Sequence, residues 1–246
     1  TAVALAAELH ADVCEIYTDV DGVYTADPRI VPNARKMEEV TYDEMLEMAS
    51  LGAKVLHSRC VEIAKKYGVE LLVCSSLNRN SGTMVREKTK MEKMLISGVA
   101  ADKNVAKIRV AGLGNDPEST FRLLNLLDRN NLNIDVMIQS LGKDGTKSVS
   151  FTVAKPDMLR TIDVLNDNKN SLGIKKLDYD ENVAKVSVIG AGVRSHSGVA
   201  AKMFGALANA GINTEMVTTS EIRITALIDE AYADQAMRAI HETFLE

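Results

Sequence analysis

The pattern of apolar and polar positions changes its period along the chain. In the first part, the β-branched and aromatic run VCEIYT at 13–18 and the run VELLVCSS at 69–76 predict two buried strands. Between them, from Tyr42 to Tyr67, apolar residues recur at helical spacing, and Gly52 interrupts the pattern, so we expect two helices there. This alternation of strands and helices is typical of an α/β layer protein.

Two polar stretches flank these predicted elements. The first strand leads into DVDGVYTADPR, where Gly22 and Asp27-Pro28 are turn formers, so residues 19–36 are expected to form a loop at the C-terminal end of that strand. Ligands of open α/β sheets usually bind at this end of the strands. The dense mixed charges of residues 86–94 instead predict an exposed connector between domains.

An internal duplication occupies the rest of the chain. The sequence NVAKIRVAGL at 104–113 returns as NVAKVSVIGA at 182–191. Apolar and polar residues alternate in both copies, which predicts a strand with one buried face and one solvent face, the latter formed in the second copy by Lys185 and Ser187.

Each copy continues with the same order of predicted elements. A polar turn, an amphipathic helix, two further strands and a second helix follow, so the order βαββα occurs twice. This order suits two small α+β sandwiches with helices on one face of an antiparallel sheet. On pattern alone, a structural repeat without a ligand stays open as an interpretation. Free backbone amides at a helix N-terminus, beside short polar side chains, can also hold a carboxylate.

Composition narrows the classes of function. With 246 residues, of which 46% are hydrophobic and 26% charged, the chain is typical of a globular protein of two or three domains. The 29 basic and 34 acidic residues give a net charge of −5, and no basic run is interleaved with aromatic residues, so we expect no nucleic-acid partner. No apolar stretch approaches the length of a membrane span, so we expect no membrane partner and a cytoplasmic location.

The cysteines and the first residues bear on the cellular compartment of the protein and on whether residues precede Thr1. The three cysteines are odd in number and lack CxxC spacing, which indicates buried free thiols in a reducing compartment and no metal site. The opening sequence TAVALAAELHAD has no Met, no basic leader and no capping residue before its Ala-rich helix. We therefore expect further residues upstream.

Two motifs in the first part carry a family resemblance. YTDVDGVYTADPRIVPNA at 17–34 and MASLGAKVLH at 48–57 resemble the nucleotide-binding part of the aspartate kinases, which are members of the amino acid kinase family. In that family two ACT domains follow in tandem, and the duplication resembles these modules, which bind free amino acids between paired copies. The resemblance covers the whole chain. It implies the C-terminal part of a three-layer α/β amino acid kinase fold, followed by two α+β, ferredoxin-like ACT domains.

The resemblance also implies domain bounds. Residues 1–90 would be the nucleotide-binding C-terminal part of the kinase domain, and residues 104–180 would be the first ACT domain. The second ACT domain would combine residues 94–103 with residues 181–246. In the family the strand at 95–103 joins the second ACT domain, so the first domain is inserted into the second.

A first set of site residues is implied for ATP. Tyr24 offers a flat apolar face for a purine, Thr18 and Asp19 offer polar groups for its edge and ribose, and Arg29 offers a fork for phosphate oxygens. Lys54, near the expected start of the second helix, adds a positive charge. Singly, such residues are more often surface charges, turn formers or core residues, and only the combination favours a site. The set is Thr18, Asp19, Tyr24, Thr25, Ala26, Asp27, Pro28, Arg29, Lys54 and Val55.

A second set is implied for an effector amino acid at the ACT domains. Lysine is the first expectation, and threonine, alone or together with lysine, is the next. Because ACT sites lie between paired copies, a homodimer or higher homo-oligomer is expected. The set is Asn115, Thr120, Asn133, Ile134, Asp135, Gln139, Gly192, Val193, Asn213, Thr214, Ser220 and Glu221.

The activity that the resemblance implies is phosphorylation of L-aspartate to 4-phospho-L-aspartate by ATP and Mg²⁺, in lysine, threonine and methionine biosynthesis. The family's Lys-Phe-Gly-Gly loop and Gly-Arg-Gly-Gly-Ser-Asp segment, which bind aspartate and steer the phosphoryl group, are absent from this sequence. Because phosphoryl transfer depends on that positioning, we assign no catalytic residue and expect the chain alone to be inactive.

Two other functions stay open. The alternative is a non-catalytic, amino-acid-sensing regulatory subunit, for which MEKMLISGVAAD, beginning at Met91, would be a natural start. A free-standing sensor has no use for a nucleotide loop, so residues 1–85 favour the enzyme. A purely structural interaction protein ranks third.

Overall fold

The computed structural model describes residues 1–52, 55–78, 80–88 and 95–245. Its contacts divide the chain into two compact units, each built from more than one segment. Unit 1 comprises Thr1–Asp102, Lys185–Ile228 and Tyr232–Glu246, and unit 2 comprises Lys103–Ala184 and Asp229–Ala231. Among the described residues, no helix is both long enough and apolar enough to cross a membrane.

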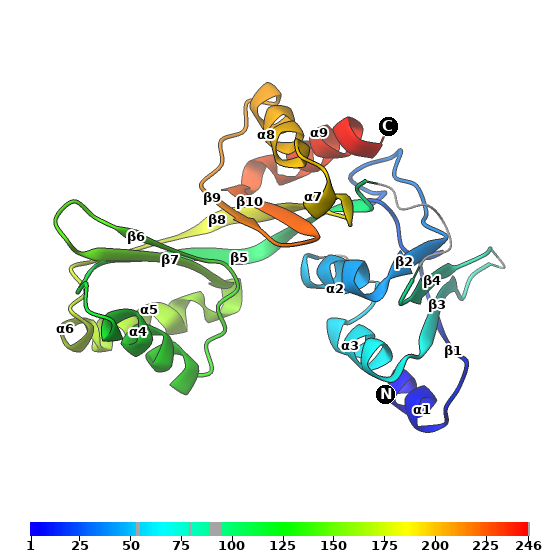
Figure 1. Ribbon diagram of the computed structural model, residues 1–246, viewed down its shortest axis with the longest axis horizontal. Helices are drawn as coiled ribbons and strands as arrows, with labels where there is room; N and C mark the ends of the chain where they lie inside the picture. Colours follow the sequence, from blue (N-terminus) through cyan, green and yellow to red (C-terminus); the bar gives the residue numbers. More distant parts are fainter. Residues whose placement is uncertain (53–54, 79, 89–94, 246) are drawn as a thin grey trace. The chain divides into compact units, whose positions relative to one another are not determined.

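The first part of unit 1 is a mixed sheet packed with helices (Figure 1). Its elements are α1 (Ala2–Glu8), β1 (Val13–Thr18), β2 (Glu39–Thr41), α2 (Tyr42–Ser50), α3 (Ser58–Tyr67), β3 (Glu70–Ser75) and β4 (Thr83–Arg86). The strand order is β1-β3-β4-β2, and β1 runs parallel to β3. Strand β4 is antiparallel to β3 and parallel to β2. The two predicted strands and the break between two helices are therefore confirmed.

Local sequence explains where these helices begin and end. Thr41 and Glu44 form a capping box at the start of α2, because the Thr41 side chain accepts from the Glu44 amide and the Glu44 side chain accepts from the Thr41 amide. Helix α3 begins at Ser58 rather than near position 54, and the His57 side chain caps it. Gly68, with φ of 69°, ends it.

The predicted connector at 86–94 begins too early. Arg86 belongs to β4, where its guanidinium forms an ion pair with Glu39 on the neighbouring β2, and both side chains are largely buried. Strands β2 and β4 are short and become strands only through their pairing, so the sequence pattern did not predict them. Residues 89–94 of the predicted connector lie outside the described residues.

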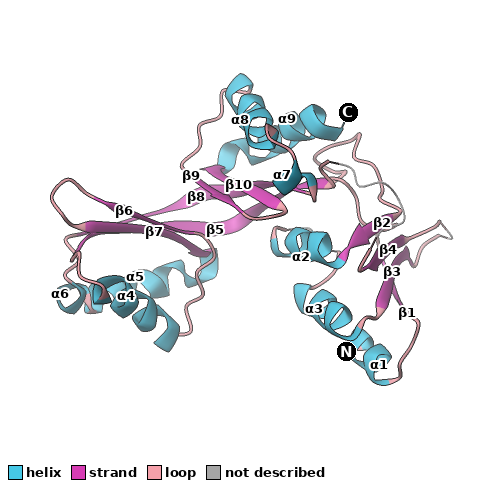
Figure 2. Ribbon diagram, in the orientation of Figure 1, coloured by secondary structure: helices cyan, strands magenta, loops and turns pink. Residues whose placement is uncertain are grey.

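The remainder of unit 1 holds the second copy of the repeat. Strand β8 (Lys176–Ile189), which enters unit 1 at Lys185, leads to α7 (Gly192–Ser195), α8 (Val199–Asn209), β9 (Met216–Thr219), β10 (Arg223–Asp229), the 3-10 turn η2 (Glu230–Tyr232) and α9 (Ala233–Leu245). Within this run, Asp229–Ala231 are assigned to unit 2. Helices α8 and α9 pack against Val186, Val188, Ile224 and Ala226, on one face of the strands. Figure 2 shows both helices together on that side. The predicted βαββα order is thus observed, with α7 added.

The expectation that Lys185 and Ser187 face solvent is wrong. Both side chains are buried, with Ser187 Oγ 2.7 Å from Thr225 Oγ1 and Lys185 Nζ 3.2 Å from Asp102 Oδ2. The reason is tertiary: Ile189, on the same face of β8, packs into the core of the first part of the chain. A strand buried on both faces gives no solvent face to its polar residues.

Unit 2 holds the first copy of the repeat, and its helices cover one face of the strands (Figures 1 and 2). Its elements are β5 (Gly98–Leu113) from Lys103 onward, α4 (Glu118–Arg129), β6 (Met137–Leu141), β7 (Lys147–Ala154), the 3-10 turn η1 (Lys155–Asp157), α5 (Met158–Asp167) and α6 (Lys169–Leu172). Strand β7 is antiparallel to both β5 and β6. Ala106, Ile108 and Val110 are buried while Arg109 is exposed, so the predicted alternation is confirmed here.

The strands of the first copy follow the order β6-β7-β5, and those of the second copy follow the order β8-β10-β9. The segment at 95–102 contacts the second copy: Ser97 N donates to Ile189 O at 2.7 Å, and Gly192 N donates to Leu95 O at 3.0 Å. Ile96 and Val99 lie in the core formed by α8 and α9. The exact bounds of three domains stay a prediction.

Candidate functional site

A cavity of about 470 Å³ lies in unit 1, at the C-terminal end of β1. Nine of the ten residues predicted to bind a nucleotide line it, and Lys54 lies outside the described residues. The nine are Thr18, Asp19, Tyr24, Thr25, Ala26, Asp27, Pro28, Arg29 and Val55. The structure therefore gathers into one cavity residues that the sequence places in two separate segments.

Close packing fixes the conformation of the 19–36 loop. Gly22 has φ of 145°, and a Cβ there would overlap the Thr83 hydroxyl. That hydroxyl accepts from Val23 N at 2.8 Å and donates to Met37 O at 2.6 Å. Thr25 N donates to Arg35 O at 2.9 Å, which closes the loop on itself.

Two charged residues at the cavity are paired with each other. Asp27 accepts from the Arg29 side chain, with Nη2–Oδ2 at 2.6 Å, and from the Arg29 amide at 2.9 Å. Hydrogen bonding to Arg29 holds the pKa of the Asp27 carboxyl below its usual value. The Arg29 side chain is 88% exposed, so an arriving anion can reach it, though it would have to share the guanidinium with Asp27.

Further lining residues are apolar and lie outside the set predicted to bind the nucleotide. Met48 lies on α2, and Gly52 follows that helix. Residues 99–101 come from β5, and Met237 comes from α9. A methionine on the core face of a predicted helix gives no sequence signal of a binding role, because the same pattern marks any core residue. The cavity thus combines apolar walls with a few polar groups, an arrangement common in small-molecule sites.

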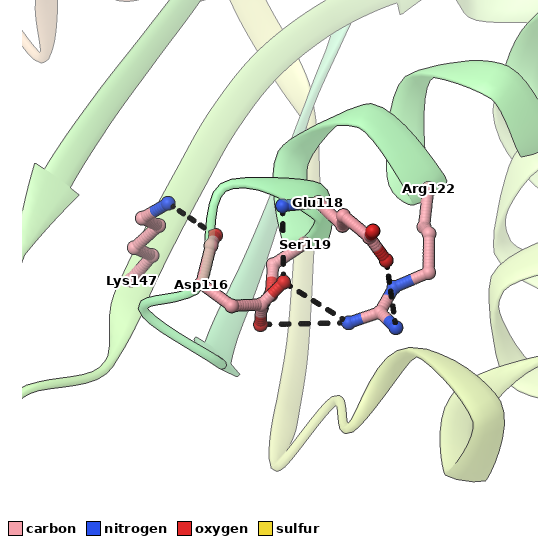
Figure 3. Close-up of polar contacts among 5 residues, drawn as sticks. All are labelled: Asp116, Glu118, Ser119, Arg122 and Lys147. Atoms are coloured by element: carbon pink, nitrogen blue, oxygen red, sulfur yellow. Dashed lines mark hydrogen bonds and ion pairs between the residues drawn. The ribbon is translucent and has the colours of Figure 1, made fainter.

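In unit 2, the strand-to-helix turn before α4 is occupied by its own carboxylate (Figure 3). Asp116 Oδ1 accepts from Glu118 N at 3.0 Å, and its other oxygen accepts from the Ser119 hydroxyl. Arg122 Nη2 lies 3.4 Å from both oxygens, and Lys147 Nζ donates to the Asp116 carbonyl at 2.9 Å. The hydrogen bond from Ser119, aided by Arg122, lowers the pKa of Asp116. An external carboxylate would therefore meet an amide that is already bonded.

The effector residues predicted in unit 2 fall into two groups. Thr120 Oγ1 donates to Gln139 Oε1 at 2.7 Å, at the N-terminal end of α4 near the exposed Asn115. Asn133 and Asp135 are exposed beyond the C-terminal end of α4, and Ile134 packs partly into the core. Twelve helical residues span about 18 Å, so one amino acid within a single copy cannot contact both groups.

The effector residues predicted in the second copy are divided in the same way. Gly192 and Val193 are at least partly buried at one end, where the exposed Glu221 pairs with Arg194 at 2.8 Å. Ser220 N donates to Arg223 O at 2.8 Å. Asn213 and Thr214 lie at the other end of α8, where with Phe204, Leu207, Ala208, Gly211 and Ile212 they line a second cavity of about 330 Å³.

Comparison with protein families finds two matches in this chain. Residues 1–75 match the amino acid kinase family, and residues 186–244 match the ACT domain. The chain is 45% identical to an aspartokinase of Pseudomonas aeruginosa over 99% of its own length. It spans 60% of the length of that relative.

Solved structures agree with these matches. All of the chain superposes on 55% of E. coli aspartokinase III in complex with aspartate and ADP, with a TM-score of 0.88 and 29% identity. The same enzyme in complex with lysine and aspartate, described as the T-state, gives a TM-score of 0.81 at equal identity and coverage. In a structure of aspartokinase alpha and beta subunits, 98% of one chain matches 61% of this chain, with 42% identity and a TM-score of 0.57. The expected fold class, a mixed α/β kinase part followed by ACT domains, is confirmed.

Proposed function

This chain belongs to the aspartokinase family, and from that membership we propose that it supplies the nucleotide site and the effector-binding part of an ATP-dependent aspartate kinase. The reaction would convert L-aspartate to 4-phospho-L-aspartate, in the biosynthesis of lysine, threonine and methionine. The observation that carries the proposal is the cavity of unit 1, because it gathers nine predicted nucleotide residues from two motifs.

The residues of the cavity fit a nucleotide. Its volume of about 470 Å³ lies within the range of small-molecule sites, roughly 300–1,000 Å³. Tyr24, Val55 and Met237 offer apolar surface for a purine, and Asp19, with Thr18, offers acceptors for its polar groups. Arg29 offers charged donors for phosphate oxygens. The E. coli relative was solved with ADP, in agreement with this assignment.

When bound, ATP would supply the γ-phosphoryl group, with Mg²⁺ neutralising charge on the phosphate oxygens. The residues of this chain would bind and orient the nucleotide and exclude water from the apolar side of the cavity. The two motifs that the family uses to bind aspartate are absent from this sequence, so we propose that activity requires the kinase residues of a longer protein. L-Aspartate would then be a partner of that protein.

We further propose that lysine is the effector, with threonine as the second candidate. The E. coli relative was solved with lysine in its T-state. Because the effector residues of each copy lie at opposite ends of a helix, we propose that paired ACT domains of a homodimer or larger homo-oligomer bring them together. Inhibition would follow from a shift between two arrangements of the protein, because the effector binds one of them better.

The alternative role, a separate regulatory subunit, is supported by the regulatory subunit of aspartate kinase from Thermus thermophilus, 99% of which matches 61% of this chain, with 33% identity and a TM-score of 0.58. The amino acid kinase match at 1–75 favours the enzyme, since a sensor without nucleotide needs no such part. The discriminating observation is nucleotide binding: the enzyme needs it and the sensor does not.

The test is steady-state kinetics on the full-length protein, with Arg29→Ala and Arg59→Ala compared. Arg29 lines the cavity, whereas Arg59 lies on α3 and does not. We expect Arg29→Ala to raise the KM for ATP, or to lower kcat/KM, by about tenfold or more, since a charge-assisted contact is lost. Arg59→Ala should not change these constants. Unchanged ATP kinetics in Arg29→Ala, or a full-length protein without aspartate kinase activity, would contradict the proposal.

A further inference from the structure

Four apolar residues of the 19–36 loop pack into the core of the second repeat. Ala26 and Val31 are buried together with Met203, Met237, Ile240 and Leu245, in the core formed by α8 and α9 of the second repeat. Ile30 and Ala34 pack partly against the same core. The loop that lines the nucleotide cavity is therefore anchored in the second repeat, although it leaves a strand of the kinase part.

Polar contacts hold the same loop to the same helix. Thr25 Oγ1 lies 3.0 Å from His241 Nε2 on α9, and both residues are buried, with 3% and none of their surface exposed. The same hydroxyl accepts from Arg35 N at 3.0 Å, and the Arg35 guanidinium donates to the carbonyl of Leu245 at the end of α9. A buried hydroxyl that is bonded to two partners has little freedom to rotate or shift.

The Thr25 backbone is fixed as well. Its carbonyl accepts from Val99 N at 2.8 Å, and β5 approaches so closely that a Cβ on Gly98 would lie 3.0 Å from that carbonyl. Met237, one helical turn before His241, faces the cavity and forms part of its wall. Helix α9 thus contributes one residue to the wall and one to the support of the loop.

From these contacts we infer that α9 of the second repeat completes the nucleotide site, with His241 as a positioning residue that acts through Thr25. The inference rests on the proposed nucleotide binding at this cavity. It gives the second ACT domain a direct structural part in nucleotide binding, in addition to its sensing of an effector. Loss of the Thr25–His241 contact would loosen the loop from Thr25 to Arg29, all five residues of which line the cavity.

The experiment is calorimetric titration of ADP into the full-length protein and its variants, with thermal unfolding measured in parallel. Thr25→Val and His241→Ala each remove one partner of the contact. Thr225→Val is the matched control: it makes the same change at another buried threonine of unit 1, whose hydroxyl bonds Ser187 and which does not line the cavity. His241→Gln tests rescue, because an amide can donate or accept at the position of Nε2.

We expect Thr25→Val and His241→Ala to raise the Kd for ADP about threefold to tenfold, the loss of roughly one buried hydrogen bond. Thr225→Val should lower the melting temperature about as much as Thr25→Val does, and should leave the Kd for ADP within twofold of the parental value. His241→Gln should bind ADP more tightly than His241→Ala. If Thr25→Val and His241→Ala keep the parental Kd, or if Thr225→Val weakens ADP as much as they do, the positioning role is wrong. A parent protein that binds no ADP would overturn the proposed nucleotide site as well.

Discussion

The two copies of the βαββα repeat share an element order and differ in what surrounds their sheets. In the first copy, the core consists of residues between Ala106 and Leu177, all from the repeat itself. In the second copy, the core takes in Ala26 and Val31 from the 19–36 loop, and Ile189 packs on the opposite face into the core of the kinase part. A duplicated sequence has therefore produced one self-contained domain and one that supports a binding loop.

The strand-to-helix turns differ in charge as well as in packing. At the start of α4, the Asp116 carboxylate accepts from the Glu118 amide and from the Ser119 hydroxyl, so one of the helix's first amides is bonded by the chain itself. In the second copy, α8 begins after Gly198, which has φ of 102° and no side chain to cap it, and the turn before it carries Arg194. An external anion would meet the Asp116 carboxylate at the first turn, and at the second it would meet Arg194, whose guanidinium it would share with Glu221.

The largest expected effect is a loss of stability on truncating a side chain in the core of either repeat copy. Ile240→Ala and Leu123→Ala each truncate a fully buried side chain, in the second and first copy respectively, and each should lower the free energy of unfolding by about 2–5 kcal/mol. Only Ile240→Ala should also weaken ADP binding, because its core holds the 19–36 loop. Denaturant unfolding and ADP titration of the full-length variants check this. An equal loss of ADP affinity in both variants would contradict the claim that only the second copy supports the 19–36 loop.

The next effect concerns the effector. Asp135→Ala in the first copy and Glu221→Ala in the second test which copy contributes to effector binding. Where the residue contacts the effector, the inhibition constant for lysine should rise about fivefold or more, as expected for a coupling of about 1–3 kcal/mol. Inhibition curves with lysine and threonine, singly and combined, measure it. A parallel loss of kcat would indicate a structural role, and unchanged constants in both variants would place the effector elsewhere.

A smaller effect is expected for the ion pair that joins α2 to β10 in the second copy. Arg223 Nη1 lies 2.8 Å from Glu47 Oε2, and the two side chains are only 18% and 23% exposed. A double-mutant cycle with Glu47→Gln and Arg223→Gln should give a coupling of about 1 kcal/mol or more. The exposed pair Arg194–Glu221 serves as the control and should couple by roughly 0–1 kcal/mol. Equal couplings would show that α2 adds nothing to the support of this sheet.

The smallest effect is the pH dependence of the first turn. The pKa of Asp116 is lowered in the folded protein from its ordinary value near 3.8, first by the Ser119 hydrogen bond. Its stabilisation is therefore complete above the unfolded pKa and is lost as the pH falls through the folded pKa. Asp116→Asn should flatten the acid limb of stability against pH, between about pH 5 and the folded pKa. Asp144, also with a lowered pKa, keeps a residual slope in the variant. If the acid limb is the same in Asp116→Asn and the parent, the ionised Asp116 carboxylate does not contribute to the stability of the folded protein.

Local patterns in the sequence predicted much of this architecture. The alternation at 105–110, the helical spacing around Gly52 and the turn formers at Gly22 and Asp27 act over a few residues, and the structure confirms each. The motif at 17–34 also identified most of the cavity wall. These signals work because periodicity and backbone preference are properties of neighbouring residues.

What only the tertiary structure decided lies in contacts between distant segments. Sequence spacing could not show that Lys185 and Ser187 are buried, because Ile189, on the same face of β8, meets a core formed by residues between Val3 and Ala100. Nor could it show that Met237 lines the cavity or that His241 meets Thr25 across 216 positions. Apolar burial is non-directional, so the sequence determined that these faces must be covered, and only the packed chain determined what covers them.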